Sequence, residues 1–220
     1  MPEHDPQKSI VVLISGSGSN LQAIIDAVTR GQINGRITAV LSNKTDAFGL
    51  QRAQKAGIYT ATLDHNAYPD RLSFDQAMMA EIDQHQPHLV VLAGFMRILT
   101  SDFVRHYEGR LFNIHPSLLP KYKGLHTHQR AMDAGDKEHG CTVHFVTEEL
   151  DGGPLAVQGR VSIDPEDTVE SLQQKVHLIE HQIYPLAVEW FCADRLKWTP
   201  QGIELDQQPL PAEGFQLSTG

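Results

Sequence analysis

Asn113 and His115 are the two residues of this sequence whose types and spacing most directly suggest catalysis. Residues 111–114 predict a short buried strand, which Pro116 ends because proline has no N–H for a central ladder. Residues two apart share one face of a strand, so the amide and the imidazole would lie together at its carboxyl end. Open α/β sheets bind ligands at that end. The pair could stabilise an oxyanion and transfer a proton; an irregular loop with a structural histidine is the alternative.

Asp151 is a third candidate, in a Leu-Asp-Gly-Gly-Pro bend between two expected strands. Gly152 and Gly153 allow positive φ angles and the close approach of a ligand. If Asp151 meets His115, its negative charge would favour the imidazolium form and orient the ring. An ordinary aspartate in a β-turn is the competing interpretation.

A glycine-rich bend at residues 15–20 could bind an anion, because it joins a buried strand to a helix that Asn20 would cap. Leu21 stands where a dinucleotide site needs its third glycine, and Ser42-Asn43 stands where such a site needs an acid. A Gly-Lys-Ser/Thr sequence for a nucleotide triphosphate is absent as well. A single sugar phosphate therefore fits better than NAD or ATP, and a turn that only allows packing is the alternative.

Two further segments could contact a larger ligand. Residues 96–99, Met-Arg-Ile-Leu, follow a buried strand and could line a pocket for a flat heterocycle, or belong to the core. Arg71 lies on an expected helix and could face a carboxylate, although a solvated arginine is commoner. The candidate metal ligands are four histidines: His126, His128, His139 and His144. They complete no recognised metal-binding spacing, so no metal is expected.

Alternating strands and helices position these groups and predict a doubly wound, mostly parallel α/β sheet. The expected strands are 9–14, 37–41, 58–63, 88–93, 111–115, 140–147 and 155–163. The expected helices are 20–30, 47–56, 70–84, 100–107, 124–134 and 168–190. Residues 1–8 form a polar tail, 9–195 one domain with halves at 9–115 and 116–195, and 196–220 a small hairpin and tail.

Composition narrows the class of protein. The chain has 220 residues and a formal net charge of −9, which argues against a nucleic-acid-binding surface. Two cysteines are too few for a disulfide framework, and Cys141 is expected to be buried. Apolar runs are too short to span a membrane and the first residues lack a signal core, so a cytoplasmic location is expected.

Four segments together resemble the phosphoribosylglycinamide formyltransferases, the folate-dependent enzymes of purine biosynthesis, over roughly residues 9–196. The matching segments are 11–20, 90–99, 112–120 and 140–153. The chain departs from the family pattern at Ser17, where asparagine is frequent, and at Lys123, where proline is common. Neither change removes a candidate catalytic group.

The resemblance implies roles for the candidate residues. Gly16, Ser17, Gly18, Ser19 and Asn20 would hold the phosphate of the glycinamide ribonucleotide, and Glu180 would lie near its ribose. Arg71, Met96, Arg97, Ile98, Leu99 and Asn113 would surround 10-formyltetrahydrofolate. His115 would transfer protons, Asp151 would tune it, and Asn113 would polarise the formyl oxygen. Residues 9–115 would be the phosphate-binding half and 116–195 the folate-binding half.

The resemblance also implies a small-molecule enzyme that needs neither metal nor nicotinamide and binds neither nucleic acid nor membrane; a homodimer is compatible with it. A formyltetrahydrofolate hydrolase is the nearest alternative, although such enzymes usually carry a further N-terminal domain. A methionyl-tRNA formyltransferase would need an RNA-binding domain, which the length and charge do not favour. A non-catalytic nucleotide-binding module is the alternative from another class, but the complete set of Asn113, His115 and Asp151 disfavours it.

Overall fold

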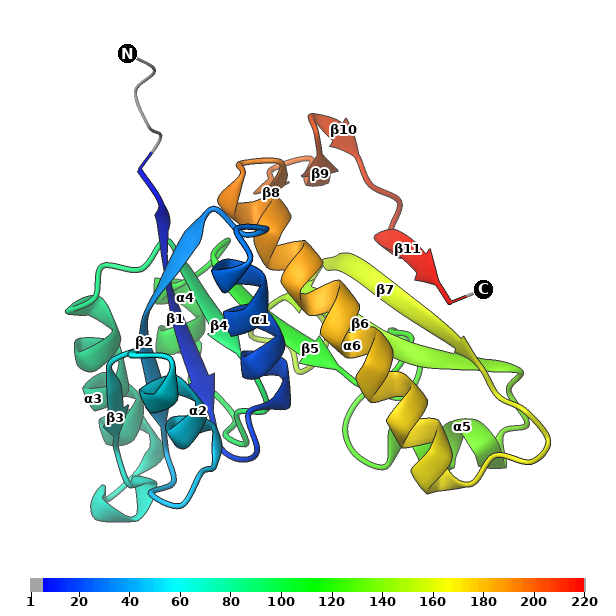
Figure 1. Ribbon diagram of the computed structural model, residues 1–220, viewed down its shortest axis with the longest axis horizontal. Coiled ribbons are helices and arrows are strands. Elements are labelled where there is room, and N and C mark those ends of the chain that lie inside the picture. Colours follow the sequence, from blue (N-terminus) through cyan, green and yellow to red (C-terminus); the bar gives the residue numbers. More distant parts are fainter. Residues whose placement is uncertain (1–5, 220) are drawn as a thin grey trace.

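A computed structural model describes residues 6–219 and contains one eight-stranded sheet, in the order β11-β7-β6-β5-β4-β1-β2-β3. The first five strands run parallel, whereas β6 is antiparallel to both of its neighbours. The predicted mostly parallel α/β fold is therefore confirmed (Figure 1). The strands of this sheet are β1 Lys8–Ile14, β2 Gly35–Ser42, β3 Thr60–Thr62, β4 Leu89–Leu92, β5 Leu111–His115, β6 Glu138–Phe145, β7 Leu155–Ser162 and β11 Phe215–Ser218.

Helices cover both faces of the sheet, as expected for a doubly wound fold. In Figure 1, α1 and the long α6 cross the near face side by side. The side chains of α3 and α4 belong to a separate core with the opposite face of β1 and β4. The helices are α1 Ser19–Thr29, α2 Gly49–Lys55, α3 Arg71–Asp83, α4 Ser101–His106, α5 Thr127–Asp133 and α6 Val169–Cys192, with a 3₁₀ turn at His65–Ala67.

Alternating residues of β1 supply the two cores. Ile10 and Val12 pack with α1 and α6, whereas Val11 and Leu13 pack with α3 and α4. All four side chains are fully buried, which is why this strand is apolar at every residue from Ile10 to Ile14 rather than at every second one. The central strand thus fixes the position of the glycine-rich turn that follows it.

A side chain caps the N-terminus of helices α3, α4 and α6, and the sequence predicted the caps of α4 and α6. The hydroxyls of Thr100 and Thr168 accept hydrogen bonds from backbone N–H groups three residues on, and the Asp70 carboxylate does the same for α3. The predicted cap at Asn20 is wrong. Helix α1 starts one residue earlier, after Gly18 in a left-handed conformation, and the Asn20 amide instead donates to Glu180.

The C-terminal segment contains more structure than the predicted hairpin. Strands β8 Leu196–Thr199, β9 Gly202–Leu205 and β10 Gln208–Pro209 form a small antiparallel sheet. The chain then returns to the main sheet, where β11 pairs in parallel with β7. Within residues 6–219, no helix has the length and apolar character needed to cross a membrane.

Candidate active site

A cleft of about 840 Å³ lies at the carboxyl ends of β1, β4 and β5. The chain leaves β1 toward β2 on one side and reaches β4 and β5 on the other, so this is a topological switch point. Most of the predicted site residues line this one cleft: Gly16, Ser17, Gly18, Ser19, Asn20, Met96, Arg97, Ile98, Asn113, His115, Asp151 and Glu180.

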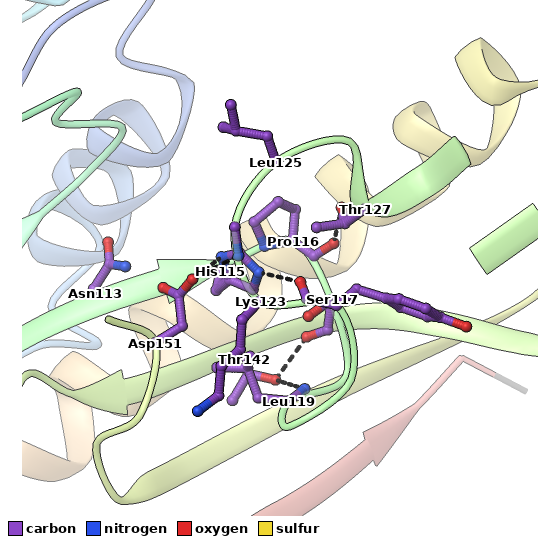
Figure 2. A network of polar contacts seen from close by, with 12 residues as sticks. Asn113, His115, Pro116, Ser117, Leu119, Lys123, Leu125, Thr127, Thr142 and Asp151 are labelled. Atoms are coloured by element: carbon purple, nitrogen blue, oxygen red, sulfur yellow. Dashed lines mark hydrogen bonds and ion pairs between the residues drawn. The ribbon is translucent and has the colours of Figure 1, made fainter. Parts of the chain in front are cut away.

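His115 and Asp151 meet at the floor of the cleft, although they are far apart in the sequence. The Nδ1 atom of His115 lies 3.5 Å from Oδ2 of Asp151, and both side chains are largely buried. Figure 2 shows the Asp151 carboxylate beside the His115 ring, with Asn113 two residues before His115 on β5. Oδ2 of Asp151 also accepts a hydrogen bond of 3.0 Å from the backbone N–H of Gly124.

The other nitrogen of His115 identifies which ring atom is free to exchange a proton. Nε2 lies 2.8 Å from the carbonyl oxygen of Tyr122. A carbonyl only accepts, so Nε2 must carry a hydrogen. In the neutral ring Nδ1 is therefore the nitrogen with the free lone pair, and it lies next to the Asp151 carboxylate.

Asn113 is oriented by a buried histidine on the adjacent strand. Residues Asn113 and His144 are directly opposite each other in the antiparallel β5–β6 pair, and Nδ2 of Asn113 lies 3.3 Å from Nε2 of His144. Nδ1 of His144 lies 3.0 Å from the carbonyl of Phe145, so it is the donor and Nε2 is the acceptor. Burial lowers the pKa of His144, which favours this neutral form. The second hydrogen of the Asn113 amide is left for a ligand.

The glycine-rich turn is held close to a second helix start. A Cβ at Gly18, which has a φ of +73°, would lie 2.6 Å from Cα of Gly49, so a larger residue would push α2 away. The N–H of Gly49 also donates to the carbonyl of Gly16. Free amides and the positive end of α1 make this turn suited to an anion.

Glu180 closes the same end of the cleft from α6. Oε2 of its carboxyl accepts a hydrogen bond of 3.2 Å from Nδ2 of Asn20. Burial raises the pKa of Glu180 to about 7, and the hydrogen bond from Asn20 partly opposes that effect. A carboxyl of this kind can accept from, or donate to, a hydroxyl of a ligand.

Two predicted folate-binding residues lie outside the cleft lining. Arg71 is exposed at the first turn of α3, and Leu99 packs against the core formed with α3 and α4. Met96 and Ile98, by contrast, line the cleft and are exposed in it. The roles that the resemblance implies for Arg71 and Leu99 stay predictions.

Sequence reasoning missed several contributors. The Tyr122 carbonyl has no side-chain signature, so nothing in the sequence points to it. The sequence indicates His144 only as a candidate metal ligand, and no local pattern shows that β6 would place it opposite Asn113. His126, His128, Gln173 and His177 also line the cleft. In the described part of the chain, no cluster of three or more His, Cys, Asp or Glu side chains is arranged to hold a metal ion.

Residues 8–188 match the formyl transferase family, and the chain belongs to this family. The phosphoribosylglycinamide formyltransferase of Escherichia coli (strain K12) is 55% identical over 94% of this chain and 98% of its own length. The enzyme of that name from Haemophilus influenzae is 48% identical over 94% and 98%. A structure of phosphoribosylglycinamide formyltransferase from Coxiella burnetii superposes with a TM-score of 0.92, at 52% identity, over 96% of this chain and 99% of the other. Within the family the chain groups with the phosphoribosylglycinamide formyltransferases, which confirms the predicted resemblance.

Proposed function

We propose that this protein transfers the formyl group of 10-formyltetrahydrofolate to the amine of 5'-phosphoribosylglycinamide. The products are the N-formyl ribonucleotide and tetrahydrofolate, in de novo purine biosynthesis. The observation that carries the proposal is that Asn113, His115 and Asp151 line one cleft together with residues 16–20. Similarity to the phosphoribosylglycinamide formyltransferases over nearly the whole chain supports this pair of substrates.

The two ends of the cleft suit the two substrates. Residues 16–20 offer backbone amides and a helix N-terminus to the ribonucleotide phosphate, with Glu180 near the ribose. Exposed apolar side chains at Met96 and Ile98 offer a surface to the pterin of the folate. The division into a phosphate-binding half, 9–115, and a folate-binding half, 116–195, stays a prediction from the sequence; the two ends of the cleft do not coincide with it, because Met96 and Ile98 lie in the first half and Glu180 in the second.

The chemistry follows from the donors at the cleft floor. The substrate amine attacks the formyl carbon, and negative charge develops on the former carbonyl oxygen. The free amide hydrogen of Asn113 and the protonated Nδ1 of His115 stabilise that charge; a preorganised donor of this kind can be worth about 3 kcal/mol. As the bond from carbon to N10 breaks, a proton leaves the attacking amine and reaches N10 through Nδ1 or a bound water. Asp151 orients the ring and stabilises its charged form.

The test measures formyl-folate turnover with and without the ribonucleotide, in wild type and in Asp151→Asn. We expect turnover only with both substrates, and a loss of at least ~10²-fold in the variant with its fold retained, because the charge that supports His115 is gone. Asp46→Asn, which changes an exposed carboxylate, is the matched control and should be unaffected. Turnover without the ribonucleotide would instead indicate a hydrolase, and an active Asp151→Asn variant would remove this residue from the mechanism.

The proposal extends to setting and partners. We place the reaction in the cytoplasm, in agreement with two free, buried thiols at Cys141 and Cys192. Two further points stay predictions from the sequence. One is that the protein needs no metal or nicotinamide and binds neither nucleic acid nor a membrane. The other is that it can form a homodimer.

A further inference from the structure

The hydroxyl of Ser15 joins two cleft-lining segments from behind the cleft. Ser15 follows β1 and directly precedes the glycine-rich turn. Its Oγ accepts a hydrogen bond of 2.8 Å from the backbone N–H of Met96, in the segment that follows β4. The same hydroxyl donates to Oδ1 of Asn43 at 2.6 Å. The Ser15 side chain therefore ties the Met96 segment to the residue that directly precedes Gly16 in the chain.

The Ser15 hydroxyl orients the Asn43 amide. Because the Ser15 oxygen accepts from Met96 and its single hydrogen goes to Asn43, only Oδ1 of the amide can face it. Nδ1 of His65 lies 3.3 Å from both Nδ2 and the backbone carbonyl oxygen of Asn43, so the ring contacts this residue as well. Ser15 is 5% exposed and Asn43 is 1% exposed, so water cannot easily replace either partner.

The Met96 segment has no regular secondary structure between β4 and α4. Individual hydrogen bonds to its backbone therefore set its position, unlike a strand or helix that many bonds hold. Removing the Ser15 hydroxyl would leave the Met96 N–H and the Asn43 Oδ1 without their partner. Both groups would favour a rearrangement that satisfies them again, and the segment with Met96 and Ile98 would move.

We propose that Ser15 and Asn43 are positioning residues that hold the segment facing the folate at a fixed distance from the phosphate cradle. They thereby couple the binding of the two substrates. This inference rests on the proposed function, because it assigns one substrate to each segment. Its importance for catalysis follows from geometry: reacting atoms must approach to about 3–3.5 Å, and a misplacement of about 1 Å can cost ~10²-fold in rate.

The test compares Ser15→Ala with Ser42→Ala. Ser42 is also buried and its hydroxyl is also hydrogen bonded, but only to the backbone of Lys44, so the control loses the same atom without removing a donor or acceptor of the network. We expect Ser15→Ala to raise KM for formyl-folate about 10-fold and to lower kcat, as about 1.4 kcal/mol of positioning would give. Ser42→Ala should leave both constants within about twofold of wild type. Ser15→Thr retains the hydroxyl and should recover most of the loss.

A binding measurement tests the coupling directly. The affinity for the ribonucleotide is measured with and without saturating tetrahydrofolate, in wild type and in Ser15→Ala. Tetrahydrofolate should change ribonucleotide affinity in wild type and change it at least threefold less in the variant. A His65→Phe variant, which removes the ring nitrogen that contacts Asn43 at a half-buried position, should shift KM for formyl-folate in the same direction by a smaller factor.

Two outcomes separate this inference from the proposed function. Wild-type protein that does not transfer the formyl group to the ribonucleotide refutes the proposed function itself. If wild type is active but Ser15→Ala and His65→Phe keep normal kinetic constants and coupling while melting at lower temperature, the network only stabilises the fold. That result would overturn the inference and leave the proposed function standing.

Discussion

Replacing Glu180 by glutamine should remove a pH dependence from the stability of this protein. The carboxyl is 6% exposed, and burial raises its pKa from the usual 4.5 to about 7. Between these two pH values the folded protein keeps the proton that the unfolded chain has lost. Stability therefore falls as the pH rises through this window, and the full penalty is present above about pH 7.

The size of the effect follows from the two pKa values. They differ by ~2.5 units, and each unit corresponds to about 1.36 kcal/mol, so the penalty approaches about 3 kcal/mol at pH 8. Glutamine cannot ionise and keeps an oxygen that accepts from Asn20. The unfolding free energy of the variant should thus increase relative to that of wild type as the pH rises from 5 to 8.

Urea unfolding at pH 5, 6, 7 and 8 measures this difference for wild type and for Glu180→Gln. Glu166→Gln changes an exposed carboxylate before the same helix, and its stability relative to wild type should not vary with pH in this range. The informative quantity is how the difference in unfolding free energy between variant and wild type changes with pH, because glutamine also alters packing by a constant amount. A difference in unfolding free energy of the same size at pH 5 and at pH 8 would refute the assignment of Glu180 as a buried, ionising carboxyl.

Two further substitutions test the packing of the sheet and the orientation of Asn113. Gly140→Ala would place a Cβ against the carbonyl oxygen of Gly159 on the neighbouring strand. We expect urea titration to show a loss of about 3 kcal/mol in unfolding free energy. An unchanged unfolding midpoint would contradict this close approach of the two strands. His144→Phe removes the acceptor that orients the Asn113 amide, so we expect kcat to fall about 10-fold with a retained near-ultraviolet circular dichroism spectrum, and normal kcat would show that the amide orients itself.

Helix starts show where local chemistry was sufficient to predict the fold and where it was not. Thr100 and Thr168 were predicted as caps and cap their helices, because the partner of a capping hydroxyl lies three residues away in the chain. Asn20 has the right type for a cap but donates to Glu180, 160 positions further along. Nothing near residue 20 could indicate that a carboxyl on α6 would take its amide.

The candidate site shows the same division. The strand ending at His115 and the bend at Asp151 were predictable from apolar runs, proline and glycine. The pairing of β5 with β6 then decided that Asn113 would be opposite His144. Strand β11 joins β7 through backbone hydrogen bonds. Its sequence alternates only weakly between apolar and polar residues, so it does not predict this pairing.

The sequence by itself determined the order of strands and helices as far as α6 and the kinds of candidate reacting group, because apolar periodicity, caps and turn residues act over a few positions. Only the tertiary structure decided which nitrogen of His115 faces Asp151, that Arg71 lies outside the cleft, and that Ser15 meets Met96. Those outcomes depend on which strand ends become neighbours at the switch point of the sheet. Contacts between groups distant in the chain, several of them backbone carbonyls or amides, are set by packing and leave no local pattern.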